Sequence, residues 1–290
     1  MSGQNGYTEA QAEEWQAEFI EDYGQKKALL PMRCSQSGWL SGTGTVHFTI
    51  VENDQITTTR GANGDIVYRN TNQRGIEVAL EEALGAEEID NFTAFKSSVD
   101  QRRIMYLRVE GAIERKKDDM ILAELDGTPN DLNEGDLPGG SGSDGFVLNR
   151  INAQELTSYF HTLTVGADGE TTGLLTVRAF ATLEAQVEVS SRDYSDEMPL
   201  QKGYKPFRWQ GILWIPYARG LPGAGTNQAK CWIFHNSAVS FKEAGALSMI
   251  VDFDKKHRKY FCNGQEWAAA KRTLDDGVLE FLHDDSVAYT

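Results

Sequence analysis

The apolar and polar positions in the first third of the chain change period, from that of a strand to that of a helix. Residues 45–51 alternate between polar and apolar side chains, which is the period of a half-buried strand. Apolar residues are then sparse as far as residue 75, and Asn63-Gly64 is a hairpin-turn sequence. The alternation returns over residues 76–80. We therefore predict a long two-stranded excursion over residues 38–78, which needs support from another chain or remains a surface loop.

A helical period follows over residues 97–126. At about 1.5 Å per residue this helix would be about 45 Å long. Its middle, Glu114–Asp119, contains no apolar residue, so we expect a waist that faces solvent or a neighbouring subunit. Asp118 and Asp119 are the candidate contacts there. The acidic stretch before the helix, residues 81–90, is expected to be a connector.

Residues 8–24 predict a short amphipathic helix at the N-terminal end. Trp15, Phe19 and Tyr23 stand four residues apart on one face of it. This stripe packs either on the protein's own core or on a neighbouring subunit, and the sequence leaves both open.

The rest of the chain predicts a mixture of short helices and strands. Residues 127–150 are rich in Gly, Ser, Asp and Pro, so we expect a loop that links two parts. Apolar runs favour strands at 211–215, 231–234, 247–253, 259–262 and 277–282. Trp209, Trp214 and Trp232 are expected in the core. The predicted class is α+β.

Composition narrows the range of functions. The net charge of −15 argues against a surface that grips nucleic acid or an anionic membrane, because phosphate binding needs clustered Lys and Arg. No apolar run reaches the ~18 residues of a membrane span. The N-terminal residues contain neither a basic region nor an apolar run, so we expect no secretory signal peptide. Three widely spaced cysteines indicate reduced, mostly buried thiols.

Motifs for catalysis, metals and cofactors are missing from the sequence. The histidines show no metal-ligand spacing. Residues 140–145 match the spacing of a dinucleotide-binding glycine motif, but loop residues precede them where that motif requires a strand. The adjacent pairs Asp118-Asp119 and Asp275-Asp276 do not form an acid–base pair, and the second is expected to be a turn. We predict no catalytic residue, no metal, no cofactor and no enzymatic activity.

The order of these parts resembles the major capsid protein of tailed bacteriophages, with the Hong Kong 97-type fold. Residues 57–70, leading into 74–80, resemble the extended loop of that family as it returns into the peripheral domain. Residues 112–128 resemble the end of its spine helix, and residues 268–281 resemble its closing strand segment. Residues 211–222 are similar to its axial-domain strands.

The resemblance implies a domain plan and a structural function. It places an N-terminal arm at 1–37, an extended loop at 38–78, a peripheral domain at 79–150 and 246–290, and an axial domain at 151–245. Such proteins form pentamers and hexamers of an icosahedral shell around double-stranded DNA, with no sequence-specific binding. The implied partners are copies of the chain, a separate scaffolding protein, a portal and a decoration protein, and no membrane. The implied location is the virion, after assembly in the cytoplasm of the host bacterium.

One feature of some family members is not expected here. They cross-link covalently through a lysine of the extended loop, but residues 38–78 contain no lysine. We expect Arg60, Arg69 and Arg74 to form noncovalent pairs with carboxylates of a neighbouring subunit instead, because arginine suits bidentate pairing. Trp15 and Phe19 are further candidate contacts. Two alternatives stay open, namely a nanocompartment shell protein of the encapsulin type and a soluble enzyme of unknown type.

Overall fold

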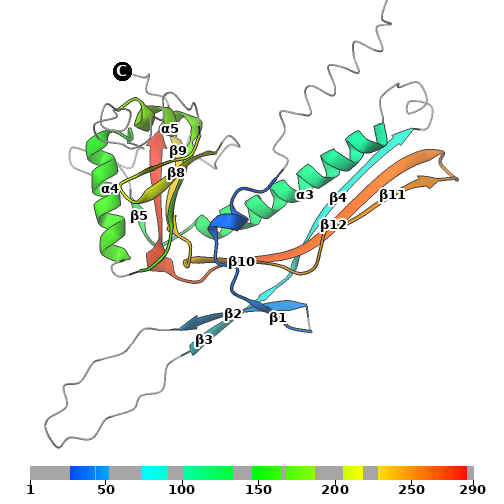
Figure 1. Ribbon diagram of the computed structural model, residues 1–290, viewed down its shortest axis with the longest axis horizontal. Helices are drawn as coiled ribbons and strands as arrows, with labels where there is room; N and C mark the ends of the chain where they lie inside the picture. Colours follow the sequence, from blue (N-terminus) through cyan, green and yellow to red (C-terminus); the bar gives the residue numbers. More distant parts are fainter. Residues whose placement is uncertain are drawn as a thin grey trace, which may run out of the picture. The chain divides into compact units, whose positions relative to one another are not determined.

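The computed structural model describes residues 27–42, 44–51, 73–90, 101–132, 146–164, 167–186, 205–217 and 228–285. The chain divides into two compact units (Figure 1). The first comprises residues 1–31, 37–121 and 241–270, and the second comprises residues 32–36, 122–240 and 271–290. The short 3-10 helix η1 (Pro31–Arg33) spans the first boundary between them.

A small antiparallel sheet in the first unit confirms the predicted strands at 45–51 and 76–80. Its order is β1 (Trp39–Leu40), β2 (Thr45–Val51) and β3 (Gln73–Ala79). Strands β2 and β3 pair from Thr45↔Ala79 to Val51↔Gln73. The inward residues are few: Val46 and Phe48 are buried with Ala269, and Val78 and Leu80 pack against them. The tip of the excursion lies outside the described residues.

The helix predicted at 97–126 is confirmed as α3 (Gln101–Leu125), and residues 97–100 lie outside the described part. Alongside it in the first unit runs β4 (Glu81–Asp90) (Figure 1). Strand β4 pairs antiparallel with β12 (Lys259–Arg272), whose other edge pairs with β11 (Ser248–Asp254). Strand β10 (Val239–Glu243) belongs to the same sheet.

The expectation of an acidic connector at 81–90 was wrong. In β4 the small residues Ala83 and Gly85 point inward, and most of the acidic side chains lie on exposed positions. A Cβ added at Gly85 would come within 2.9 Å of Val109 on α3. The absence of a side chain lets the sheet approach the helix closely, so the segment forms a strand despite its few large apolar residues.

A six-stranded mixed sheet forms the centre of the second unit, in the order β5-β13-β9-β6-β8-β7. The strands are β5 (Asp131–Leu132), β6 (Thr171–Thr176), β7 (Phe207–Trp209), β8 (Ile212–Tyr217), β9 (Gln228–His235) and β13 (Val278–Asp284). The β13–β5 and β6–β8 pairs are parallel. These strands confirm the predictions at 211–215, 231–234 and 277–282. The strands predicted at 247–253 and 259–262 correspond to β11 and to the start of the longer β12 in the first unit.

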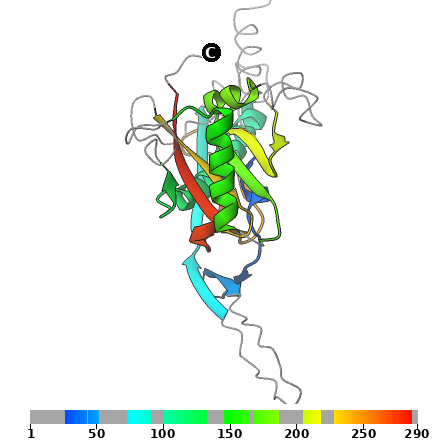
Figure 2. The ribbon, with the colours of Figure 1, turned by 90° about the vertical axis from the view of Figure 1, so that its left-hand side faces the viewer.

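Two helices pack on one face of this sheet, as Figure 2 shows for α4 (Arg150–Leu163). The second is α5 (Val177–Glu184). Asn149 and Thr176 cap the two helices by accepting hydrogen bonds from backbone N–H groups of the first turn. The core beneath them includes Phe160, Phe180, Trp214, Ile233 and Phe281.

The tryptophans lie where the sequence analysis placed them. Trp214 and Trp232 are fully buried, and Trp209 is partly buried against the same core. Gly173 on β6 lies against the ring of Trp214, where an added Cβ would stand 2.4 Å from a ring carbon. This position therefore tolerates no side chain without a shift of the indole.

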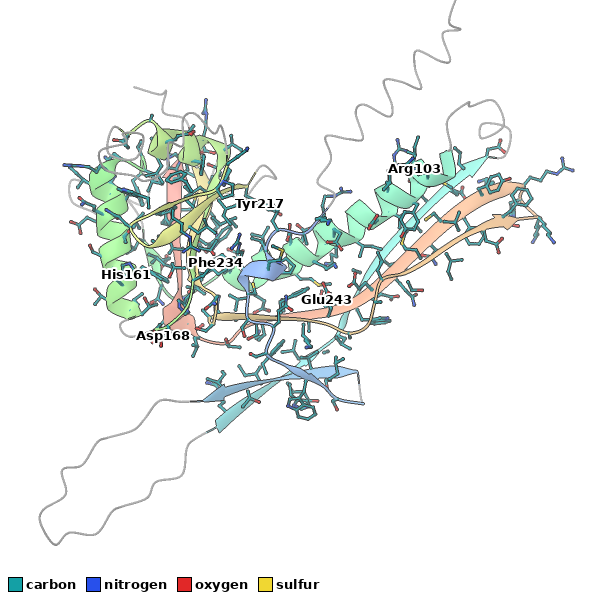
Figure 3. The ribbon with its side chains drawn as sticks, in the orientation of Figure 1. Arg103, His161, Asp168, Tyr217, Phe234 and Glu243 are labelled. Atoms are coloured by element: carbon teal, nitrogen blue, oxygen red, sulfur yellow. The ribbon has the colours of Figure 1, made fainter. Side chains whose placement is uncertain are left out.

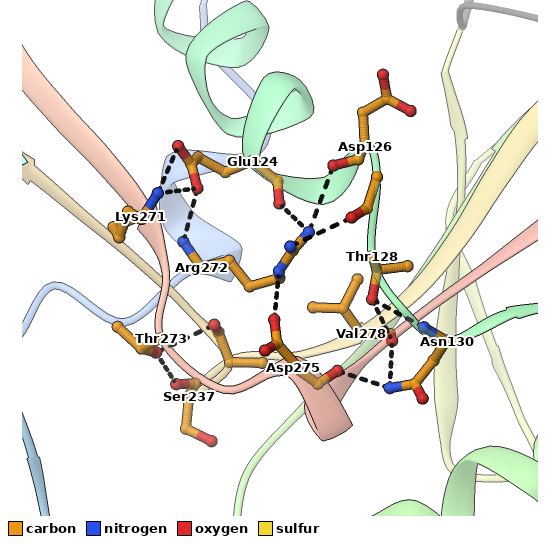
Figure 4. Close-up of polar contacts among 12 residues, drawn as sticks. Glu124, Asp126, Thr128, Asn130, Ser237, Lys271, Arg272, Thr273, Asp275 and Val278 are labelled. Carbon is orange, nitrogen blue, oxygen red and sulfur yellow. Dashed lines mark hydrogen bonds and ion pairs between the residues drawn. The ribbon is translucent and has the colours of Figure 1, made fainter.

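The end of α3 is fastened to the chain that follows β12, as Figure 4 shows. The Arg272 guanidinium donates to the backbone carbonyls of Glu124 (3.0 Å), Asp126 and Gly127, and to the carboxylate of Asp275 (2.7 Å). Asp275–Gly277 is a 3-10 turn (η3), which confirms the predicted turn. The last carbonyls of a helix have no partner within it, and Arg272 supplies one.

The two units differ from the predicted domain plan most of all in two segments. Residues 271–290 were grouped with the helix, but β13 pairs along its whole length with β9 in the second unit. The loop expected at 127–150 is partly attached to the same sheet, because β5 pairs with β13 and Phe146 forms a bridge to His283.

Candidate assembly surfaces

The residues predicted to contact neighbouring subunits fall into three groups. Arg74 is exposed on β3, opposite Ile50 of β2. Asp118 and Asp119 lie on α3, the first buried and the second half-buried. Trp15, Phe19, Arg60 and Arg69 lie outside the described residues. The structure does not bring Arg74 together with the aspartates. Asp118 is fully buried within its own chain, and the contacts of the other six residues stay predictions.

The expectation of a solvated or neighbour-facing waist at Glu114–Asp119 was wrong for its buried side chains. Lys117 is 5% exposed and Asp118 is fully buried. Both carboxylate oxygens of Asp118 face the protein's own chain, where they accept hydrogen bonds from the backbone N–H groups of Leu29 and Leu30. The polar run of the sequence therefore turns inward.

Lys117 is the buried centre of a charge cluster. Its ammonium lies 2.7 Å from Glu114 Oε1, 3.0 Å from Glu243 Oε1 and 3.1 Å from Glu266 Oε2. Glu114 is on the same helix, Glu243 on β10 (labelled in Figure 3) and Glu266 on β12. The cluster thus ties the helix to the sheet.

Electrostatics within this cluster favour its charged form. Burial alone would lower the pKa of Lys117, but hydrogen bonds to Glu114, Glu243 and Glu266 outweigh it and raise the pKa above its usual value. Burial raises the pKa of Glu266, and the nearby ammonium offsets part of that effect. Three carboxylates face one ammonium, so Lys117 supplies the positive charge that all three share.

An exposed face of the β4–β12–β11 sheet is a candidate assembly surface that the sequence analysis missed. Leu84 is 60% exposed, Ile250 57% and Trp267 40%. We call these three residues the apolar sheet face. Successive residues of a strand point to opposite sides of the sheet. Ala83, Gly264 and Glu266 point inward, so the apolar sheet face lies on the other side of the sheet. The sequence of residues 261–268 has no apolar–polar alternation to signal this face, and the strand there was predicted to end at residue 262.

A second exposed apolar group lies at the base of the hairpin. Trp39 is exposed on β1 and stacks on His47 of β2, with ring centroids 4.3 Å apart. Leu40 is exposed beside it. Exposed apolar groups of this kind are typical of surfaces through which subunits associate.

The described residues offer little for catalysis or metal binding. No group of histidine, cysteine and acidic residues among them could hold a metal ion. All three cysteines are free and buried, and burial raises the pKa of the Cys231 thiol to about 12. That thiol is therefore protonated at neutral pH and is a poor nucleophile. None of the described helices has the length and apolar character needed to cross a bilayer.

The family follows from a comparison with known protein families. The model of a family described as phage capsid protein matches residues 7–285. The chain belongs to this phage capsid protein family. It is thus a structural component of the virion capsid. No curated protein sequence matches the chain.

Solved capsids share the fold of this capsid protein at low sequence identity. The capsid protein of cyanophage P-SCSP1u is 14% identical, with 90% of each chain covered and a TM-score of 0.64. That of Ralstonia phage GP4 is 11% identical, with 91% of this chain and 93% of that chain covered and a TM-score of 0.61. A virus-like particle from Pyrococcus furiosus is 9% identical, with 92% and 96% covered and a TM-score of 0.56. The fold is accordingly the Hong Kong 97-type α+β fold expected from the sequence.

Proposed function

We propose that this capsid protein builds the icosahedral shell of a tailed double-stranded DNA phage by assembling into pentamers and hexamers. The observation that supports this most is the family match over residues 7–285, which leaves almost no part of the chain for another function. The net charge of −15 suits a wall that packaged DNA must not adsorb to. The role is structural, without catalysis.

Exposed features of the first unit are suited to subunit contacts. The hairpin has only a small core of its own, and the apolar sheet face leaves Leu84, Ile250 and Trp267 in solvent. A neighbouring copy would bury both, which gains about 25 cal/mol per Å² of apolar surface before the costs of association. Many modest interfaces of this kind close a symmetric lattice.

We assign the first unit to the peripheral domain with its extended loop and spine helix, and most of the second unit to the axial domain. On this assignment residues 271–290 join the axial part, because β13 belongs to its sheet. The proposed partners are a separate scaffolding protein, a portal and a decoration protein, and the proposed site of assembly is the cytoplasm of a bacterial host.

Size and content of the purified particles test the function. The chain is expressed alone and together with the other head genes of its phage, and is studied by size-exclusion chromatography and negative-stain microscopy. Capsomers or megadalton particles are expected, and a lone peak at 32.2 kDa in both preparations would contradict the proposal. Uniform shells from the chain alone would contradict a separate scaffolding protein.

A nanocompartment shell is the second candidate, favoured by the likeness to the virus-like particle from Pyrococcus furiosus. Its particles would contain a protein cargo in place of DNA. Nuclease-protected DNA in particles purified from infected cells supports the phage shell, whereas particles with protein cargo and no DNA support the nanocompartment.

Charge reversal tests the proposed arginine contacts. Arg60→Glu, Arg69→Glu and Arg74→Glu are each expected to reduce particle yield while the circular dichroism spectrum of the unassembled chain stays unchanged. Conversion to Lys is the matched control, because it keeps the charge and loses the fork of donors, so its yield should be intermediate. Normal particles from the Glu variants would exclude this role.

A further inference from the structure

The chain segment that follows the N-terminal 26 residues is held by a carboxylate from a distant part of the sequence. Asp118 Oδ1 accepts hydrogen bonds from the backbone N–H groups of Leu29 and Leu30, both at 3.0 Å, and Oδ2 lies 3.2 Å from Leu29 N. Asp118 and the Leu30 side chain are both fully buried. Hydrogen bonds to an ionised acceptor in a buried place are among the stronger ones in proteins.

A second carboxylate, one helical turn earlier, continues the same pattern. Glu114 Oε2 accepts from the backbone N–H of Ala28 at 2.9 Å. Glu114 and Asp118 are four residues apart on α3, so they lie on one face of the helix. Together they bind the three consecutive N–H groups of residues 28–30.

The pair is braced by the charge cluster around the buried Lys117. Lys117 contacts the other oxygen of Glu114 at 2.7 Å and joins it to Glu243 and Glu266 on the sheet. The Glu114 carboxylate is therefore oriented before it meets the segment. A preformed acceptor loses less entropy when it binds.

We propose that Glu114 and Asp118 form an arm latch, which fixes residues 28–30 on α3 and so sets the position from which the N-terminal arm reaches its contacts in the shell. The link to the shell rests on the proposed function. The latch itself is a property of the isolated chain: without the two carboxylates, the backbone of residues 28–30 loses its partners and detaches while the rest of the unit stays folded.

Hydrogen exchange of the unassembled chain tests the latch directly. Mass spectrometry follows a peptic peptide that contains residues 28–30, and other peptides from α3 and β12 serve as internal references. In Asp118→Asn and Glu114→Gln the residue 28–30 peptide is expected to exchange at least tenfold faster than in the native chain. The matched control is Asp119→Asn, which removes the adjacent, half-buried carboxylate and should leave this peptide unchanged.

Two outcomes would overturn the latch. Unchanged exchange of the residue 28–30 peptide in both variants would show that the carboxylates do not hold it. Equally faster exchange in the α3 and β12 peptides would show a general loss of stability instead of local release. Glu114→Gln guards against a failure of Asp118→Asn to fold, since Glu114 is less buried than Asp118.

Assembly of the same variants tests the delivery of the arm. Variants that show local release are expected to yield at least tenfold fewer particles than the native chain. Normal yields from such variants would overturn the coupling between latch and shell. If the native chain forms neither capsomers nor particles with its head genes, the proposed function fails, and the exchange experiment still decides the latch.

Discussion

At the scale of single residues, the polar run Glu114–Asp119, which the sequence suggested was exposed, contains buried charged side chains. Lys117 is almost fully buried and holds carboxylates from α3, β10 and β12. Lys117 and Glu266 are the buried ions of this cluster, and each would be unfavourable there without its partner. The cluster therefore contributes specificity of packing more than net stability.

Lys117→Met should lower the free energy of unfolding by about 3–5 kcal/mol, because it leaves the buried Glu266 carboxylate without its counter-charge. Urea denaturation of the unassembled chain at pH 7 measures this. Lys117→Met/Glu266→Gln should recover part of the loss, since it removes that charge. A loss below about 1 kcal/mol would show that the cluster is open to water.

The pH dependence of the same variants has a definite sign. The pKa of Lys117 is raised in the folded state, so its charge stabilises the fold fully below pH 10.5. This stabilisation is lost as the pH rises through the pKa of the folded state. Glu266 has a raised pKa, so its ionised form opposes folding, and stability recovers as the pH falls toward 4.5. The gap between the native chain and Lys117→Met should shrink at alkaline pH.

Gly173 provides a steric test in the second unit. In Gly173→Ala the new Cβ would overlap the Trp214 ring, which should cost about 1–3 kcal/mol through displacement of the indole. Gly75→Ala on β3 is the control, because nothing lies within 4 Å of its Cβ position. Thermal unfolding compares the two, and equal melting temperatures would contradict the close packing at Trp214.

At the scale of elements, α3 is held by contacts near its middle and at its C-terminal end. Its apolar residues Val109 and Ile113 meet glycines of β4 and β12, and its last carbonyls are bound by Arg272. A helix of this length is stabilised mainly by such tertiary contacts.

Arg272→Ala should destabilise the second unit by about 2 kcal/mol, since it leaves several carbonyls at the end of α3 and the Asp275 carboxylate without their donor. Chemical denaturation measures the change. Arg178→Ala, at an exposed position of α5, should stay within about 0.5 kcal/mol. A loss no larger than that of Arg178→Ala would rule out the capping role.

At the scale of the whole molecule, the protein has features of a subunit that is completed by its neighbours. The apolar sheet face and the exposed pair Trp39 and Leu40 leave apolar side chains in solvent that a neighbouring copy would cover. The extended loop, residues 38–78, lacks lysine, so its contacts with other copies are expected to be noncovalent.

Boiling mature particles in SDS should therefore release a single band of 32.2 kDa. The reason is that hydrophobic and ionic contacts are disrupted by the detergent, whereas an amide cross-link is not. A ladder of covalent oligomers on the gel would contradict this expectation and would point to a lysine outside residues 38–78.

The sequence by itself determined the elements whose apolar residues have a clear period: the strand at 45–51, the long helix, the apolar strands of the second unit and the buried tryptophans. Their order was enough to indicate the family. Only the tertiary structure decided that 81–90 is a strand. Its inward residues are the small Ala83 and Gly85, and they face inward because α3 packs against them. It alone showed that Lys117 and Asp118 are buried, because their partners Glu243, Glu266 and residues 28–30 come from distant parts of the chain. A local pattern records the polarity of a residue, whereas burial depends on which segments fold against it.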